Sequence, residues 1–162
     1  MDVLYYLEMA LWLAVAAIGF GILFNVPKRT IATIALLAAI GGSCKLILMH
    51  FGVHIVFASL VGASIIGFLS IQAAHGKHAP PLVFSIPAVI PMVPGAFAYR
   101  SMLGFIRLTG DINSTTYEVA LDETINNGLK AAFIVLALTA GVSLPMLITR
   151  KNSAKHLKYT KP

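Results

Sequence analysis

Long apolar runs constrain this chain more than any other feature of its sequence. Five stretches are apolar over about 20 residues, the length that an α-helix needs to cross the hydrocarbon core of a bilayer. These stretches are 3–24, 31–49, 53–74, 82–108 and 129–149. In lipid a spanning segment must satisfy its own backbone hydrogen bonds, so each stretch predicts a helix. We therefore expect an all-α, polytopic membrane protein with about five transmembrane helices, of which the fourth is broken by prolines.

The composition excludes an ordinary soluble domain. Hydrophobic residues make up 58% and charged residues 11% of the 162 positions, whereas soluble proteins carry about 25% charged residues. A chain of this length cannot hide so many apolar side chains from water. The net charge of +6 is concentrated near the C-terminus, which is typical of a membrane protein and does not suggest a nucleic-acid partner. The single cysteine, Cys44, excludes an internal disulfide.

The positions of lysine and arginine predict how the chain is oriented. With five spans, Lys28, Arg29, Lys77 and the basic segment 150–162 fall on one side of the membrane. The link 50–52 and the acidic loop from Asp111 to Glu123 fall on the other side. Because basic loops remain in the cytoplasm, we expect the N-terminus outside and the C-terminus inside. Residues 1–149 then form the transmembrane domain, and 150–162 form a cytoplasmic tail that touches anionic lipid. A four-span arrangement would put the acidic loop and the basic tail in one compartment.

The fourth run contains several helix breakers in the sequence IPAVIPMVPGAFAYR. Its prolines are Pro87, Pro91 and Pro94, and Gly95 follows the last of them. Proline removes a backbone donor, so this cluster predicts a break near the middle of the bilayer and a second half-helix that starts around Gly95. The amides of Val93, Gly95 and Ala96 would then be available to an anion. The alternative is a proline kink that neighbouring helices repair.

Three charged side chains lie well inside the spans, away from their ends, where charge is costly and often functional. These are Arg100, Lys45 and Glu8, which we expect in the same outer half of the membrane, where they could form one polar cluster. The alternative is that these side chains snorkel to the interface or simply pair with one another. We take as candidate substrate-binding residues Arg100, Lys45, Gly95, Pro91, Pro94 and Tyr99. Glu8 is the candidate for proton coupling or ion pairing, and we expect no catalytic or metal-binding residue.

Two further patterns concern the helices themselves. Small residues recur at four-residue spacing, which lets membrane helices approach closely. The positions are Ser59, Ala63 and Gly67 in the third span, and Ala137 and Gly141 in the fifth. Residues 115–125 have helical periodicity and predict an interfacial helix on the outer side, which either ends near Asn126 or runs into the last span.

Two segments carry a resemblance to a known family. At FNVPKR (24–29) and IPAVIPMVPGAFAY (86–99) the chain resembles the threonine/serine exporter family, and GGSCKLILM (41–49) and GFLSIQ (67–72) fit the same pattern. The resemblance covers nearly the whole chain and is to the small, YjjB-type subunit, which corresponds to the C-terminal half of fused exporters. The block PxxxPxxPG is its most specific part.

The resemblance implies a secondary exporter without a nucleotide cofactor in the bacterial inner membrane. It implies a larger, YjjP-type membrane subunit as partner, a small carboxylate-bearing substrate such as succinate, threonine or serine, and the proton motive force as the driving force. On this basis we expect alternating access around the broken fourth span. Two other readings remain open at this stage: a subunit that only stabilises its larger partner, and a membrane-embedded enzyme, for which no motif is present.

Overall fold

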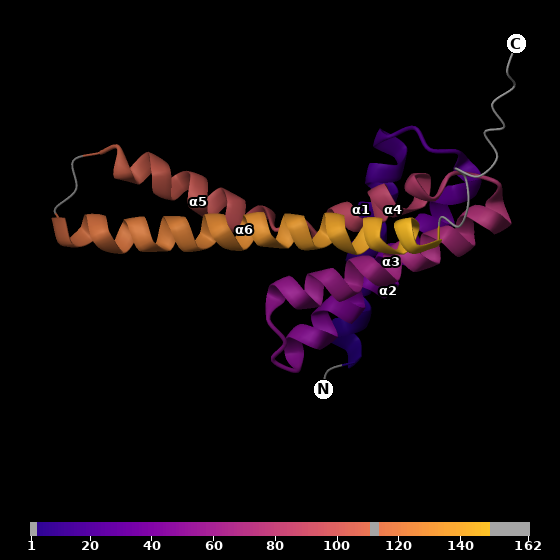
Figure 1. Ribbon diagram of the computed structural model, residues 1–162, viewed down its shortest axis with the longest axis horizontal. Helices are drawn as coiled ribbons and strands as arrows, with labels where there is room; N and C mark the ends of the chain where they lie inside the picture. The colour runs from indigo at the N-terminus through magenta and orange to yellow at the C-terminus, as the bar shows by residue number, and fades with distance from the viewer. Residues whose placement is uncertain (1–2, 111–113, 150–162) are drawn as a thin grey trace, which may run out of the picture.

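The computed structural model describes residues 3–110 and 114–149, and every element in these ranges is helical (Figure 1). Four helices are long and apolar enough to cross a membrane. They are α1 (Val3–Leu23), α2 (Lys28–His50), α3 (Ile55–Lys77) and α6 (Ser114–Thr149). The fifth span is a broken pair. It consists of α4 (Pro81–Val89) with the short 3₁₀ turn η1 (Ile90–Met92), followed by α5 (Gly95–Leu108) at a bend of 54°. The predicted all-α polytopic fold with a broken fourth span is confirmed.

Small residues build the core of the bundle. Fully buried alanines include Ala17, Ala38, Ala58, Ala63 and Ala88, while large apolar side chains such as Leu4 and Leu23 are more than 70% exposed. This arrangement is inverted relative to a soluble protein, because lipid covers large apolar side chains and close backbone approach holds the helices together. The exposed apolar surface is therefore a lipid-facing surface.

The most extensive helix contact is made between α3 and α6, and glycines allow it. A Cβ atom built at Gly141 would lie 2.7 Å from both the Ala63 Cβ and the Leu60 carbonyl oxygen. A Cβ built at Gly67 would lie 3.0 Å from Pro145 and from the Val142 carbonyl oxygen. Three of the small residues predicted to pack at four-residue spacing thus lie at this interface, namely Ala63, Gly67 and Gly141.

Two contacts show which connections share a face of the bundle. The Tyr6 ring lies 6.2 Å from the His50 ring, so the start of α1 and the link between α2 and α3 lie at the same end. Arg29 Nη2 donates a hydrogen bond of 3.4 Å to the His78 carbonyl oxygen, so the α1–α2 and α3–α4 links lie together at the opposite end. If the bent pair crosses the membrane once, the start of α1 and the end of α6 lie on opposite faces.

Helix α6 is a single helix of 36 residues, about 54 Å long at 1.5 Å per residue, nearly twice the hydrocarbon thickness. The expected interfacial helix and the last span are thus one continuous helix that passes through Asn126, Asn127 and Gly128. Helix α5 packs along the first half of α6, and α1 to α4 gather around its second half (Figure 1). We call α5 together with residues 114–130 of α6 the arm.

Candidate functional site

The break between η1 and α5 is closed by local backbone hydrogen bonds. The Val93 amide donates to the Ile90 carbonyl (3.0 Å), and the Gly95 amide donates to the Val93 carbonyl (2.9 Å) across Pro94. The prediction that the Val93 and Gly95 amides are available to an anion is therefore wrong, because a tight turn at Pro94 uses them. The Ala96 amide, in the first turn of α5, has no backbone acceptor among the described residues.

Lys45 reaches this break from α2. Its ammonium donates a hydrogen bond of 3.1 Å to the Met92 carbonyl oxygen, a group that a continuous helix would have paired with the Ala96 amide. The lysine side chain is partly buried, and no carboxylate in the described ranges forms an ion pair with it. A cation without a counter-ion thus lies inside the bundle, beside the interrupted backbone.

Gly62 of α3 allows these elements to meet. A Cβ atom built at this position would lie 2.6 Å from the Gly41 carbonyl oxygen, 2.8 Å from Met92 Cε and 3.3 Å from Lys45 Cβ. Any side chain here would push α2 and η1 away from α3. Gly62 is therefore the point where α2, α3 and the break converge, and it keeps Lys45 within reach of Met92.

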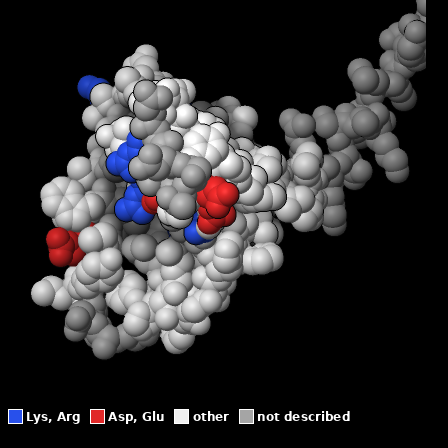
Figure 2. All heavy atoms as spheres, turned by 90° about the vertical axis from the view of Figure 1, so that its left-hand side faces the viewer, with Lys and Arg blue, Asp and Glu red and all other residues white. Residues whose placement is uncertain are grey.

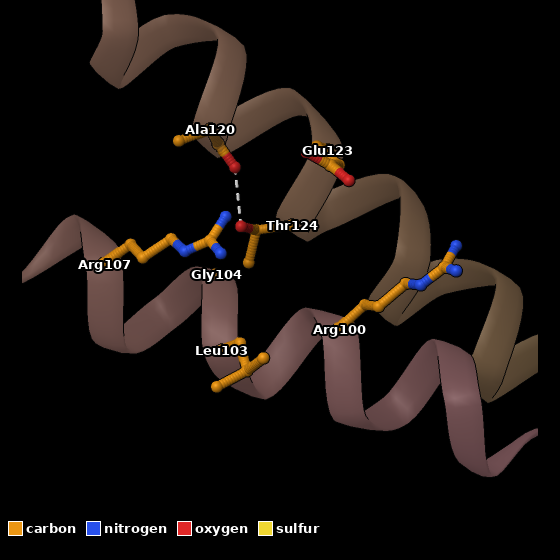
Figure 3. Close-up of a pocket in the computed structure, with 7 residues that line it drawn as sticks. All are labelled: Arg100, Leu103, Gly104, Arg107, Ala120, Glu123 and Thr124. Carbon is orange, nitrogen blue, oxygen red and sulfur yellow. Dashed lines mark hydrogen bonds between the residues drawn. The ribbon is translucent and has the colours of Figure 1, made fainter.

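Arg100 lies in a different place, in a cleft of about 220 Å³ between α5 and α6 (Figure 3). Arg107 lines the same cleft from α5, and Glu123 and Thr124 line it from α6. The Arg107 guanidinium points toward Thr124, and the Arg100 side chain extends along α6 (Figure 3). Seen from the end of the arm, basic and acidic side chains lie next to one another on a mostly uncharged surface (Figure 2).

The contacts between α5 and α6 show where the cleft lies along α6. Ser101 Oγ donates a hydrogen bond of 3.0 Å to the Thr124 carbonyl, and Gly104 packs directly on the Thr124 side chain. The cleft thus faces the polar first half of α6, before its apolar run begins at Leu129. Arg100 is an exposed residue of α5, and it lines the cleft between α5 and α6.

The structure does not gather the three ionisable residues of the spans into one cluster. Glu8 is exposed on α1, where its carboxylate accepts a hydrogen bond of 3.5 Å from Trp12 Nε1. Within residues 3–110 and 114–149, no hydrogen bond or ion pair joins Glu8, Lys45 and Arg100. Of the remaining candidates, Pro94 is buried at the break and Tyr99 is 63% exposed on the arm.

Sequence reasoning missed Arg107, Glu123 and Lys130. The spacing of Arg100, Gly104 and Arg107 corresponds to one helix face with a glycine between two cations, a signal that was present in the sequence. Glu123 looked like part of a solvated face. Lys130 lies just inside the last apolar run, and its ammonium stands 5.9 Å from the centre of the Phe97 ring, at the base of the arm. Testing every charge inside a span would have found it.

These features define a multi-pass membrane protein built around a broken span, with one cation at the break and two at the outer cleft. A family model described as "Threonine/Serine exporter, ThrE" matches residues 9–148. The chain belongs to the threonine/serine exporter family.

A curated relative is a protein of Haemophilus influenzae described as uncharacterized. It is 34% identical over 139 residues, which are 85% of this chain and 46% of that protein. The chain therefore spans about half the length of the curated relative that it matches. No solved structure matches the chain.

Proposed function

We propose that this chain is one subunit of a two-component secondary exporter of small carboxylate-bearing solutes, amino acids of the threonine and serine type or organic anions such as succinate. The observation that carries the proposal is the Lys45 ammonium at the broken span. A partly buried cation with no ion-paired carboxylate among the described residues costs free energy, so its position in the bundle indicates a role other than stability. Because the chain belongs to an exporter family, we assign this lysine a role in solute transport.

The lysine can receive a carboxylate without moving far. An ammonium has three N–H donors, and Met92 uses one of them. A solute carboxylate at the break takes the free donors and competes with the Met92 carbonyl for the ammonium. Because that carbonyl helps to close the break, its release lets the arm rock against α1 to α4, the motion that alternating access requires.

In this proposal the arm cleft binds the solute at the outer end of the transport path. Arg100 and Arg107 offer two guanidinium groups to a carboxylate, and Glu123 offers a carboxylate to an amino group. This combination fits a zwitterionic amino acid better than a dicarboxylate. A volume of about 220 Å³ lies below the roughly 300–1,000 Å³ typical of drug-sized ligands, so it suits a solute of few heavy atoms.

Transport is driven by the proton motive force in this proposal. Glu8, the one carboxylate among the described residues of α1 to α5, is the candidate for carrying the proton, and a carboxylate of the partner is the alternative. The chain lies in the bacterial inner membrane with its N-terminus outside and its basic tail in the cytoplasm. The distribution of Lys and Arg supports this orientation.

The partner is a larger, YjjP-type membrane subunit. The match covers only 46% of the Haemophilus influenzae relative, so that protein has a further region outside the match. A separate, larger subunit would provide the counterpart of that region. The arm offers a surface for that subunit, since α5 packs mainly against α6 and exposes Tyr99, Met102 and Ile106 on one face. A cysteine replacing Met102 should crosslink to the larger subunit, whereas one replacing the exposed Leu36 of α2 should not.

The test of the proposal is efflux from cells that retain the larger subunit. Threonine and succinate are accumulated, and their release is followed in Lys45→Met, Arg100→Gln and Glu8→Gln variants. We expect at least a tenfold loss of efflux in each, while Lys28→Gln, an exposed lysine at the start of α2, leaves efflux unchanged. Normal efflux from all three variants at normal expression would refute the site.

The rival proposal is that the chain only stabilises its larger partner. A cysteine at position 95 distinguishes the two proposals. A Cβ atom there would meet nothing within 4 Å, so Gly95→Cys should fold normally. If the solute passes the break, saturating solute protects this cysteine from a maleimide. A purely structural subunit shows the same labelling rate with and without solute.

A further inference from the structure

A groove opens between three helices at the end of the bundle opposite the arm. Its walls are largely apolar and are formed by Ile71 of α3, Leu82 of α4, and Met146 and Leu147 of α6. It encloses about 590 Å³, more than twice the volume of the arm cleft. His75 and Thr149 stand at its edge. Neither the exporter proposal nor the residues assigned to it use this groove.

One histidine lies at the edge of this groove, and a second histidine and an arginine lie near it. His75 also borders a neighbouring hollow that His78 lines, so the two spaces are continuous along α3. His78 ends α3 in a left-handed conformation (φ 49°), and its carbonyl accepts the hydrogen bond from Arg29 Nη2. That bond places the Arg29 guanidinium at the backbone of His78, although Arg29 comes from a different helix.

Among the described residues, no acidic side chain lies at this end of the molecule. All six carboxylate side chains of the sequence occur at positions 2–8 and 111–123, and the described ones lie at the opposite end of the molecule or on the arm. The links around residues 24–29 and 76–81 contain Lys28, Arg29 and Lys77 but no Asp or Glu. The Arg29 guanidinium therefore lies near the groove without a described carboxylate to balance its charge.

We propose that this groove binds one anionic phospholipid, with an acyl chain along Ile71, Leu82, Met146 and Leu147 and the phosphate at Arg29, His75 and His78. Apolar walls exclude a free soluble anion as the preferred ligand, because such an ion gains nothing from them. The Arg29 guanidinium without a described carboxylate beside it selects against a zwitterionic headgroup, whose cationic part has no described partner there. The inference does not depend on the exporter proposal.

Bromine quenching of a tryptophan in the groove tests this directly. Trp12, the only tryptophan of the chain, is replaced by phenylalanine, and Leu82→Trp or, separately, Leu147→Trp introduces a reporter in the groove. The full-length protein is placed in phosphatidylcholine vesicles that contain increasing brominated phosphatidylglycerol or brominated phosphatidylcholine. We expect half-quenching at a mole fraction at least threefold lower for phosphatidylglycerol. A reporter at Leu36, 59% exposed on α2, should show no preference.

Two variants and one competitor complete the test. Arg29→Gln should bring the ratio of the two half-quenching mole fractions, phosphatidylcholine to phosphatidylglycerol, close to one for the groove reporters. Lys28→Gln, its neighbour in sequence, should leave this ratio unchanged. Inorganic phosphate at about ten times the headgroup concentration should not alter quenching. The proposal is overturned if both groove reporters show no lipid preference, if neither lipid reaches them, if free phosphate abolishes the preference, or if the two variants behave alike.

Discussion

The Lys45 ammonium donates a hydrogen bond to the Met92 carbonyl oxygen, 3.1 Å away and 47 residues later in the chain. Prolines cause this pairing, because Pro91 and Pro94 lack the N–H groups that would continue the helix and the turn at Pro94 redirects the next amides. In lipid an unpaired carbonyl is costly, so a neighbouring helix supplies the donor. A lysine rather than a serine or threonine does so, which places a charge where a hydroxyl would suffice.

Replacing this lysine distinguishes a structural from a functional role. Lys45→Met loses the hydrogen bond, worth about 1.5–3 kcal/mol to a charged group, but also removes the desolvation cost of the ammonium. We therefore expect the free energy of unfolding, measured by SDS titration in micelles, to change by no more than about 1 kcal/mol. A loss of several kcal/mol, with Lys28→Gln unaffected, would mean that Lys45 serves mainly to repair the kink.

Gly62 should tolerate no side chain. A Cβ atom there would meet the Gly41 carbonyl at 2.6 Å and Met92 Cε at 2.8 Å, and the first of these is backbone that cannot turn away. We expect Gly62→Ala to lower the free energy of unfolding by about 1–3 kcal/mol, the usual cost of overpacking. Gly76→Ala on the same helix is the matched control, because nothing lies within 4 Å of its Cβ. Equal stability of the two variants would contradict the observed convergence at Gly62.

The sequence predicted the spans and the break because both depend on local chemistry. Apolar runs of sufficient length have one stable form in lipid, and Pro91 and Pro94 lack the donors that would continue the helix. The start of α5 at Gly95 follows from the same residues. Pro87 and Pro145, by contrast, lie inside α4 and α6. The union of residues 114–149 into one helix was left open, since two asparagines and a glycine disfavour helix weakly, and packing of Gly128 against Ser101 outweighs them.

The candidate site was less predictable because it depends on tertiary contacts. Lys45 was identified as a charge within a span, but no local signal shows that it reaches Met92 in another helix. Arg100 was expected to follow the break by about 8 Å of helix and to form one cluster with Lys45 and Glu8. The 54° bend carries α5 away from the bundle and onto the first half of α6, so Arg100 meets Arg107 and Glu123 instead.

The arm should open when Gly104 gains a side chain. A Cβ atom at this position would overlap Thr124 Oγ1, so α5 and α6 would have to separate. We expect Gly104→Ala to destabilise the arm by about 1–3 kcal/mol and to raise amide hydrogen exchange in residues 95–108 while α1 to α3 stay protected. Adding Thr124→Ala should recover part of the loss, because it removes the Oγ1 and Cγ2 atoms. Full protection of the single variant would show that the arm packs differently.

Lys130 should contribute little to stability despite its position within the last span. Its ammonium lies 5.9 Å from the Phe97 ring centre, near the limit for a cation–π contact, which is worth about 0.5–1 kcal/mol at such sites. We expect Lys130→Gln and Phe97→Leu to lower the free energy of unfolding by less than about 1 kcal/mol each. The double variant should differ from their sum by about the same amount if the pair interacts. An additive double variant would mean that the two side chains act independently.

The KM for each solute should depend on the charged side chains that line the arm cleft. Arg107 and Glu123 face the same 220 Å³ space from α5 and α6, so a solute held there meets both. We expect Arg107→Gln to raise the KM for threonine efflux by about 10- to 100-fold, the loss of one charge-assisted hydrogen bond of about 1.5–3 kcal/mol, with expression unchanged. Glu123→Gln should raise the KM for threonine but not for succinate, because only the amino acid carries an ammonium group for this carboxylate. Equal effects of Glu123→Gln on both solutes would show that Glu123 acts by orienting the arginines rather than by contacting the solute.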